Sequence, residues 1–479
     1  MAHFVESSLQ QLQQFHGSAD TAVRMHALKL QRNCLDKMEG LSLFCASNSE
    51  ITLCGSVFVV DITLDKSDGS VVRVKLSVAA ETTVEDKDGG IFLTRLLKQS
   101  DFKAFTNSIA ALAACDRLSS ASFPAFTVLH NIHTDMAMLY SRELAHCNGN
   151  LNQVLTEGHG VFVSNFNLVG SAFVFWAGKA DLLELEERGL AAVGNEKKEL
   201  DKCNELYTAH VRLGDGNARL NLLPSFDNKY LLSEESSIPD GMECVSVASL
   251  NGLTHQFLRN PSAEYSDSFR ASLIIEFAPA IPCTKRILES LASMPDISIP
   301  DMATPSTTSY PRTLQETHYA PRQSLEATHI LHHSNSQFSK IRFTPALLKS
   351  TDACSHLSKV SCAHPSQLLS LIQFARRQIV FNTIVASLFT PPPPMIPSDA
   401  AKRSALFGVI DVVSWNPSVS VDLSIAVIGR GVVIVQVRFV SDTEGNDVEM
   451  VGLRGDGDFE VASRVLNGTL DLGLALVYV

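Results

Sequence analysis

The chain has 479 residues and a mass of 52.1 kDa, which corresponds to two or three domains at about 150 residues each. Its formal net charge of −12 excludes the cationic excess that non-specific duplex binding requires. Hydrophobic residues make up 45% of the chain, enough for a sizeable core, yet no apolar run is long enough to span a membrane. The first residues lack the basic and apolar regions of a secretory signal. We therefore expect a globular protein that binds neither membrane nor nucleic acid directly.

The ten cysteines are scattered along the chain, mostly in apolar surroundings, and no C-x-x-C pair occurs. In a chain of this length, such a distribution indicates free buried thiols in a reducing compartment. The cysteine distribution is therefore compatible with either the cytosol or the nucleus.

The N-terminal part is predicted to contain a helix, a β-hairpin and then more helices. A helix is expected over residues 22–37 and a strand over residues 53–64. The polar stretch 65–69 ends in glycine and is typical of a turn, and residues 71–78 alternate as the return strand. Further helices are expected at 91–98, at 101–118 with Asp101 as the N-cap, and at 124–147.

The middle of the chain is predicted to be rich in β-structure. Residues 184–202 are charge-rich and are predicted to form a mobile insertion, and 282–291 a short helix. Strands are expected at 161–163, 168–169, 172–175, 207–213, 218–222, 243–249 and 272–277.

Prolines divide the second half of the chain. Residues 294–322 carry five prolines among serine and threonine, which indicates a linker or surface loop outside the core. A long apolar helix is expected at 366–389, and the run Pro391–Pro394 ends it in polyproline II conformation. The remaining elements are strands at 406–413, 418–427, 432–439 and 470–479, and a short helix at 459–466.

These elements predict a mixed α/β fold of the α+β type, with mainly antiparallel strands in several sheet and helix subdomains joined by loops. We expect an N-terminal subdomain of helix, hairpin and helices at 1–150 and a β-rich middle subdomain with the charged insertion at 151–293. A Pro/Ser/Thr-rich linker or loop at 294–340 would follow. The last subdomain, at 341–479, would contain the long helix, the polyproline spacer and C-terminal α/β structure.

The strongest candidate for a metal site is a group of four residues with zinc-binding side chains, Cys354, His356, Cys362 and His364. Their C-x-H…C-x-H spacing is unusual for structural zinc, so two unrelated turn histidines are the preferred interpretation. Two further histidine groups depend on helical i, i+3 spacing: His130 with His133, and Glu326 with His329, His332 and His333. Without a further ligand, none of these groups is assigned as a metal site.

Residues 93–97 read L-x-x-L-L, a pattern that can dock in a coactivator groove or form part of a core helix. The core helix is preferred. No phosphate-binding loop, nucleophile elbow or H-E-x-x-H motif occurs, so no catalytic residue or cofactor is predicted. Two alternatives stay open: a metal-dependent enzyme whose site is assembled across domains, and a free-standing cytoplasmic adaptor that uses the proline run.

Three blocks of sequence resemble one known family. The first runs from Met38-Glu39-Gly40-Leu41 into the predicted hairpin. The second combines Leu93-Thr94-Arg95-Leu96-Leu97-Lys98 with Asp101-Phe102-Lys103-Ala104-Phe105. The third starts at His364-Pro365 and continues through Arg376-Arg377-Gln378 to Phe381-Asn382. In this order the blocks are similar to subunit 1 of the Mediator complex of RNA polymerase II transcription.

The resemblance implies a noncatalytic scaffold in the nucleus, without cofactor, that helps to bridge transcriptional activators to the polymerase. It also implies a place in the middle module, beside subunits such as 4, 7 and 9. Arg376 and Arg377 are candidate partner contacts, although solvated positions on a core helix are the preferred interpretation. Pro391, Pro392, Pro393 and Pro394 form either a partner-binding segment or a rigid spacer, and the spacer is preferred.

Overall fold

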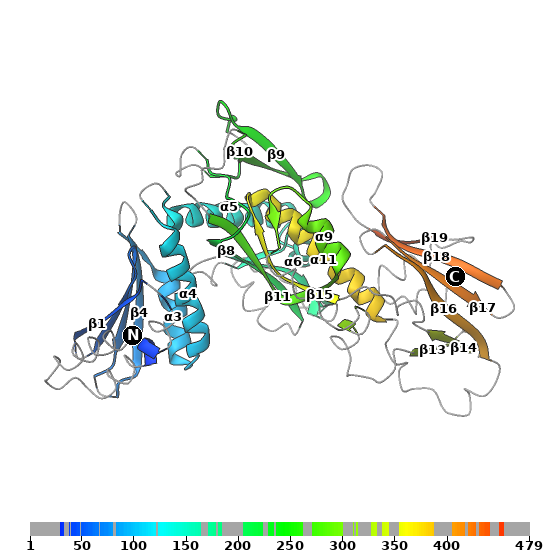
Figure 1. The fold of residues 1–479 in the computed structure, drawn as a ribbon, viewed down its shortest axis with the longest axis horizontal. Helices are drawn as coiled ribbons and strands as arrows, with labels where there is room; N and C mark the ends of the chain where they lie inside the picture. The colour runs from blue at the N-terminus through cyan, green and yellow to red at the C-terminus, as the bar shows by residue number, and fades with distance from the viewer. Residues whose placement is uncertain are drawn as a thin grey trace.

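The structure is a computed structural model in which three large sheets follow one another along the longest axis of the molecule (Figure 1). It describes residues 29–32, 38, 40–47, 49–66, 68–79, 83–120, 123–163, 171–178, 181–183, 205–223, 229–233, 236–261, 271–299, 310, 313–314, 327–332, 338–343, 354–387, 405–416, 420–427, 431–440 and 450–454.

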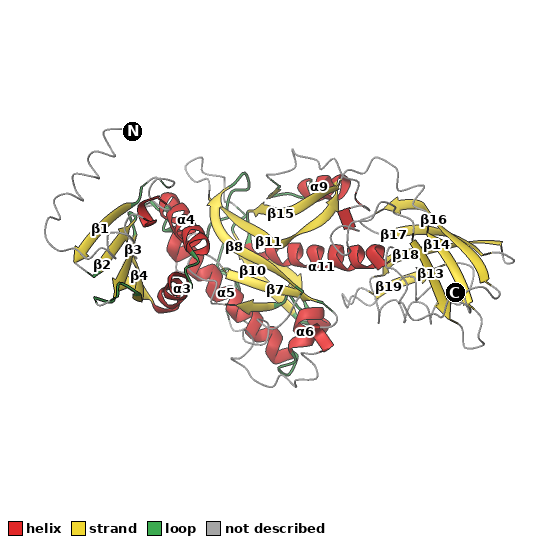
Figure 2. Cartoon of the chain, turned by 90° about the horizontal axis from the view of Figure 1, so that it is seen from below, coloured by secondary structure: helices red, strands yellow, loops and turns green. Residues whose placement is uncertain are grey.

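The N-terminal sheet is a five-stranded antiparallel meander, with helices against one face (Figure 2). Its strands are β1 (Ser42–Ser47), β2 (Glu50–Cys54), β3 (Phe58–Leu64), β4 (Val71–Ala79) and β5 (Thr83–Asp86). The helices are α3 (Lys87–Lys98) and α4 (Phe102–Leu118). Alternate residues of β3 are buried, beginning with Phe58, because successive side chains of a strand point to opposite faces.

The predicted hairpin and helix cap are confirmed. Strands β3 and β4 pair antiparallel, and Gly69, which closes the turn between them, has a φ of 69° that suits glycine. Asp101 accepts a hydrogen bond from Ala104 N at 3.0 Å and so satisfies a free N–H at the start of α4.

The single strand expected over 53–64 is wrong, because the chain reverses at residues 55–57 and forms two strands, β2 and β3. The carboxylate of Asp116 on α4 accepts hydrogen bonds from Ser56 N at 2.8 Å and Val57 N at 2.7 Å. Gly55 permits this turn, since a Cβ there would collide with the ring of Phe58. The turn therefore depends on a helix more than fifty residues further along the chain, which no local pattern revealed.

The central part contains a six-stranded antiparallel sheet in the order β12-β15-β11-β8-β7-β6, and a separate hairpin of β9 and β10. The strands are β6 (Val161–Val163), β7 (Ser171–Ala177), β8 (Leu206–Asp215), β9 (Glu243–Ala248), β10 (Thr254–Arg259), β11 (Ala271–Thr284), β12 (Ile297–Ser298) and β15 (Cys354–Cys362). The helices are α5 (Ala125–His146), α6 (Leu151–Thr156), α9 (Lys285–Ala292) and α11 (Pro365–Ser387).

Helix α11 is the long apolar helix that the sequence predicts, and it packs against this central sheet (Figure 1). Its inward face is aliphatic and fully buried at Leu368, Leu369, Leu371, Ile372, Ala375 and Ile379. These side chains belong to the main hydrophobic core, which also includes residues of α5 and β11. Helix α11 therefore holds distant parts of the chain together.

The C-terminal sheet has the order β13-β14-β16-β17-β18-β19. Its strands are β13 (Ala327–His332), β14 (Phe338–Phe343), β16 (Ala405–Asn416), β17 (Ser420–Val427), β18 (Gly431–Val440) and β19 (Met450–Arg454). All neighbours pair antiparallel except β14 and β16, which are parallel. The predicted mixed fold with mainly antiparallel sheets is confirmed.

Several local predictions differ from the structure. Residues 218–222 form no strand. The helix expected from 282 starts only at Lys285, because β11 stays paired with β15 through Thr284, which then caps α9. Within the segment expected to lie outside the core, Tyr310 and Leu314 are buried, and the Tyr310 hydroxyl donates to Asn382 on α11. The strand 168–169, the insertion 184–202, the helix 459–466 and the strand 470–479 lie outside the described residues, as does most of the helix 22–37.

The predicted subdomain boundaries stay a prediction.

The described cysteines are all free, and five of them are buried, as their sequence surroundings suggest. Among the described helices, none has both the length and the apolar character needed to cross a membrane.

A buried carboxyl on α5 holds the segment that flanks β10. Asp135 is fully buried, and its Oδ2 accepts hydrogen bonds from Tyr230 N at 2.6 Å and Leu231 N at 3.1 Å. Burial raises the pKa of Asp135 to about 7, although the two N–H groups and the nearby Lys229 and Arg142 charges oppose that rise. The carboxyl therefore carries a proton in the folded protein at pH values where the unfolded chain has lost it.

We predict that Asp135→Asn weakens the pH dependence of stability. Because the pKa is raised from 3.8 to about 7 on folding, this group contributes stability fully below its unfolded pKa and loses it as pH rises towards 7. Asparagine does not titrate, so the unfolding free energy of the variant relative to wild type should rise from pH 4 to pH 7. Urea unfolding at several pH values measures this difference, and a constant offset between the two proteins would contradict the prediction.

Candidate functional site

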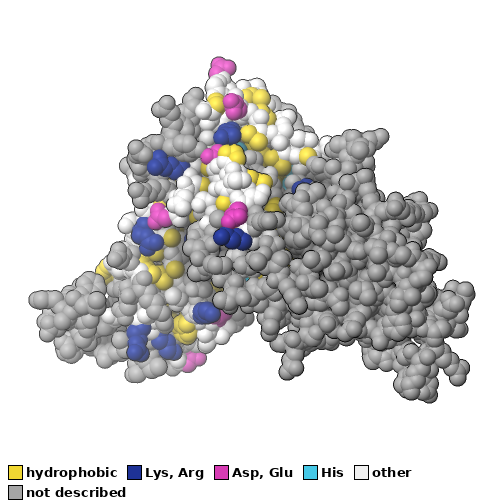
Figure 3. Space-filling view, turned by 45° about the vertical axis from the view of Figure 1, so that its right-hand side comes forward, with side chains coloured by type: hydrophobic (Ala, Val, Ile, Leu, Met, Phe, Trp, Pro, Cys, Tyr) yellow, Lys and Arg dark blue, Asp and Glu magenta, His cyan; other side chains and the backbone are white. Residues whose placement is uncertain are grey.

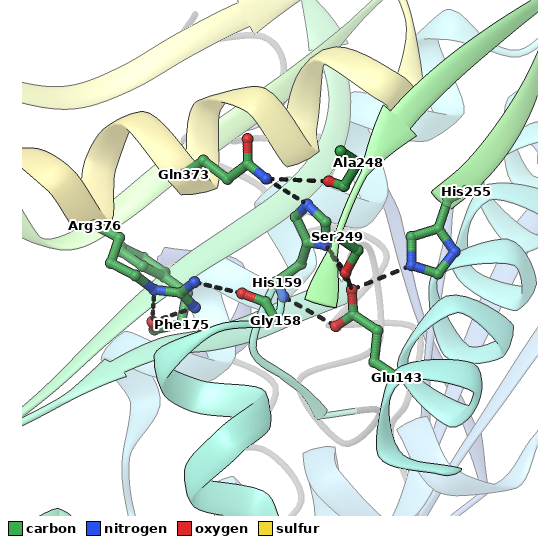
Figure 4. A network of polar contacts seen from close by, with 9 residues as sticks. All are labelled: Glu143, Gly158, His159, Phe175, Ala248, Ser249, His255, Gln373 and Arg376. Carbon is green, nitrogen blue, oxygen red and sulfur yellow. Dashed lines mark hydrogen bonds and ion pairs between the residues drawn. The ribbon is translucent and has the colours of Figure 1, made fainter. Parts of the chain in front are cut away.

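The most densely connected polar group in the described residues surrounds the carboxylate of Glu143, near the end of α5 (Figure 4). Its Oε1 accepts hydrogen bonds from Ser249 Oγ at 2.5 Å, His159 Nδ1 at 2.6 Å and His255 Nε2 at 3.2 Å. Its Oε2 accepts one from His159 N at 2.9 Å. All four residues are buried: Glu143, His159, His255 and Ser249. The carboxylate is therefore hydrogen-bonded to protein donors in place of water. We call these four residues the Glu143 network.

Two side chains from α11 extend this network. Gln373 Nε2 donates to Ala248 O at 3.2 Å and to His159 Nε2 at 3.3 Å. The guanidinium of Arg376 donates to Phe175 O at 3.0 and 3.1 Å, and also to Gly158 O, the residue before His159. The network therefore connects α5, β7, the β9–β10 hairpin and α11, whose residues lie far apart in the sequence.

The charges in the network depend on burial and on the surrounding donors. Burial alone would raise the pKa of Glu143, but the contacts with His159, His255 and Ser249 outweigh it and hold that pKa well below its usual range. Burial lowers the pKa of Arg376 to about 10, against the opposing charge of Glu143. Glu143 is therefore ionised and Arg376 protonated at neutral pH.

Both histidine rings are placed by hydrogen bonds. His159 contacts Glu143 Oε1 through Nδ1 at 2.6 Å and Gln373 Nε2 through Nε2 at 3.3 Å. His255 donates from Nε2, and its buried Nδ1 has no hydrogen-bond partner in the structure as described.

The ligand atoms of Glu143, His159 and His255 all lie within 4.8 Å of one another, and one carboxylate with two imidazoles is a set that zinc accepts. A metal-bound histidine normally donates its second N–H to an acceptor. Here His159 Nε2 faces the donating amide of Gln373, and His255 Nδ1 faces no described acceptor. The outer contacts thus differ from those of metal-bound histidines, and the Glu143 network joins elements that lie far apart in the sequence.

A cavity of about 400 Å³ lies beside the network, between strand β9 and the first turns of α11. Residues 245–248 of β9 form one wall, and Ser366, Ser370 and Gln373 of α11 form the opposite wall. Gln373 belongs to both features, because its amide bridges the end of β9 and His159.

The four residues proposed as a possible zinc set do not come together. Cys354 and Cys362 are the two ends of β15, about 26 Å apart at roughly 3.3 Å per residue. His364 is buried between Ser366 and Leu258 O, with which its ring nitrogens make 2.8 Å hydrogen bonds, whereas His356 is exposed. The two histidines are unrelated, as preferred, but only His364 lies in a turn at the entry to α11, because His356 lies within strand β15.

The other sequence candidates are described only in part, because Glu326 and His333 lie outside the described residues. His130 is exposed on α5, while His133 contacts Ser171 Oγ and the ring of Phe162. His329 and His332 lie in strand β13, so the helical spacing that would pair them does not apply. In the L-x-x-L-L segment, now part of α3, all three leucines are buried, which agrees with a core helix.

Of the candidate partner contacts, Arg376 is partly buried and binds backbone carbonyls of its own chain, whereas Arg377 is exposed. The run Pro391–Pro394 lies outside the described residues. The Glu143 network itself was missed. One signal was available, since Ile132, Met136, Leu139 and Glu143 recur at helical spacing, which places a carboxylate on the apolar face of α5.

Fold and site together describe an α+β protein whose most densely connected polar residues hold its own elements together. The family model described as "Mediator of RNA polymerase II transcription subunit 1" matches residues 26–390, which are 365 of the 479 residues. The chain belongs to this family. A search of curated proteins gives no significant match.

The family resemblance seen in the sequence is therefore confirmed: the chain is a Mediator subunit that acts in transcription regulation. The family is one of noncatalytic scaffolds, and it implies a nuclear location. Neither the metal-dependent enzyme nor the cytoplasmic adaptor gains support from the described residues.

Proposed function

We propose that this chain is a noncatalytic scaffold of the Mediator middle module, which contacts subunits such as 4, 7 and 9 and helps to transmit signals from transcriptional activators to the polymerase. The observation that carries the proposal is the family match over residues 26–390. The Glu143 network supports it, because its buried donors and acceptors are used between elements of the chain and not directed at a substrate.

The surface is compatible with docking by several small contacts. The described part of the face in Figure 3 carries acidic and basic side chains interspersed with apolar ones, without a large patch of one sign. Protein interfaces of this kind depend on a few anchors surrounded by neutral contacts. Arg377 is our candidate anchor on α11, since it is exposed at the surface. The run Pro391–Pro394 is a further candidate partner segment.

The proposal is tested by purifying the tagged chain from nuclear extract of its own source and identifying the bound proteins by mass spectrometry. Several middle-module subunits, including 4, 7 and 9, should be recovered in near-stoichiometric amounts. The tag alone is the control. Recovery of the chain without any Mediator subunit would contradict the proposal, and imaging of the tagged chain should show it in the nucleus.

We predict that Arg377→Ala lowers the recovery of middle-module subunits by about tenfold, because an interface anchor contributes more than about 1 kcal/mol to binding. Lys98→Ala is the matched control, since Lys98 is an exposed cation on α3, in the N-terminal part. If Arg377→Ala leaves the recovery of the subunits unchanged, Arg377 is not an interface anchor and the docking surface lies elsewhere.

A further inference from the structure

One edge of the β9–β10 hairpin has no neighbouring strand in the described part of the chain. Among the described strands, β9 pairs only with β10, which is covered on its other side by the segment around Leu231. There Leu232 N donates to Gln256 O at 2.8 Å, and Leu258 N donates to Tyr230 O at 2.7 Å. The outer edge of β9 is thus the open edge of this small sheet.

The register shows which groups this edge presents. The main-chain groups of Gln256 and Leu258 point away from β9, and their cross-strand partners are Ser246 and Cys244. In an antiparallel pair, directly opposite residues point their N–H and C=O groups both inward or both outward. Ser246 and Cys244 therefore point theirs outward, away from β10. The donation from Gln373 Nε2 on α11 to Ala248 O, two residues further on, agrees with this alternation.

The open edge faces the cavity described above. Four consecutive residues of β9, 245–248, line it, as expected when a strand presents its edge, whereas a strand face would contribute alternate residues. Helix α11 provides the opposite wall through Ser366, Ser370 and Gln373, and Ser246 itself is exposed. The cavity thus has the form of a groove between a helix and the open edge of a strand.

We propose that an extended segment of a partner protein in the Mediator complex adds to the edge of β9 as a further strand and lies in this groove. The N–H and C=O groups of Cys244 and Ser246 offer the main-chain hydrogen bonds by which peptides bind a sheet edge. The inference deepens the proposed scaffold function and rests on it, because it names the surface and the mode of one contact.

Charge and size define the segment that fits. Arg259 and Asp296 are the charged residues of the groove in the described structure, and they lie 3.3 Å apart as an ion pair. His364 adds no charge, because burial lowers its pKa to about 4. Small or polar residues, together with Val245 and Val247, line the remaining walls. An uncharged, short extended segment therefore matches the groove, since the outward main-chain groups of Cys244 and Ser246 are available to it, while Ala248 O already accepts from Gln373.

Hydrogen exchange of the full chain, alone and in the purified complex, tests this pairing directly. In the isolated chain, the amides of Cys244 and Ser246 should exchange rapidly, while those of Val245 and Val247, paired with β10, exchange slowly. In the complex, the Cys244 and Ser246 amides should slow by about tenfold or more. Slow exchange already in the isolated chain, or fast exchange in the complex, would overturn the proposal.

A pair of variants gives a second measurement. Ser246→Pro removes the outward N–H and places a ring at the edge, without a loss inside the hairpin. Ser246→Thr keeps the N–H and is the matched control. With Ser246→Pro, at least one Mediator subunit should be lost from the purified complex by about tenfold, and Ser246→Thr should retain it.

The outcomes separate the two proposals. If the wild-type chain recovers no Mediator subunit, the scaffold function fails. If it recovers them and Ser246→Pro recovers the same amounts, only the strand addition fails. If Ser246→Pro does not fold, the hydrogen exchange of the wild-type complex decides alone.

Discussion

Replacing Glu143 by alanine is expected to lower the free energy of unfolding by about 3 to 5 kcal/mol. The carboxylate accepts four hydrogen bonds in a buried site, from Ser249, His255 and both the backbone and the ring of His159. Removing it leaves these donors buried without an acceptor, and each unsatisfied donor costs about 1 to 3 kcal/mol before relaxation. It also removes the negative charge that favours protonated Arg376.

Urea unfolding at neutral pH measures this loss. Glu157→Ala is the matched control, because Glu157 is an exposed carboxylate just after α6, and we expect its replacement to change stability by less than about 0.5 kcal/mol. The loss of stability in Glu143→Gln should lie between the losses in Glu143→Ala and Glu157→Ala. Glutamine keeps one acceptor oxygen, but its amide N–H group faces the donors of the network. A Glu143→Ala protein as stable as wild type would show that the network does not hold the elements together.

Replacing Arg376 by alanine is expected to cost about 3 kcal/mol. The guanidinium satisfies Phe175 O at the sheet and Gly158 O in the turn before His159, and both acceptors lose their donor in the variant. Because Arg376 lies on α11, the loss also weakens the connection between this helix and β7.

Arg377→Ala is the adjacent control for this measurement, and its unfolding free energy should stay within about 0.5 kcal/mol of wild type. The double variant Glu143→Ala with Arg376→Ala should cost less than the sum of the single variants, because both act on one network. Equal effects of Arg376→Ala and Arg377→Ala would contradict the structural distinction between the two neighbours.

The network and the groove are connected through one residue. Gln373 binds His159 on one side and Ala248, at the end of β9, on the other. The Glu143 network thereby fixes the position of α11 relative to the edge of β9. A scaffold subunit needs such a rigid surface, because ordering flexible segments on binding reduces affinity.

The sequence alone identified the features that depend on neighbours within one or two turns of chain. The β3–β4 hairpin follows from alternating apolar residues on both sides of a polar turn closed by Gly69, and the start of α4 follows from Asp101. The apolar length of α11 was visible in the same way. Three ordered blocks of such local pattern also sufficed to indicate the Mediator subunit 1 family, which the match over residues 26–390 confirms.

Only the tertiary structure determined the burial and the contacts of each polar residue. Arg376 and Arg377 are neighbours with the same side chain, and only the packing of α11 against β7 partly buries the first and leaves the second exposed. Cys354 and Cys362 are close in sequence, but an extended strand separates them, whereas Glu143 and His255 are 112 residues apart and share a hydrogen bond. Local pattern reports backbone conformation, while the free energy of a buried charge depends on donors that only the folded chain brings together.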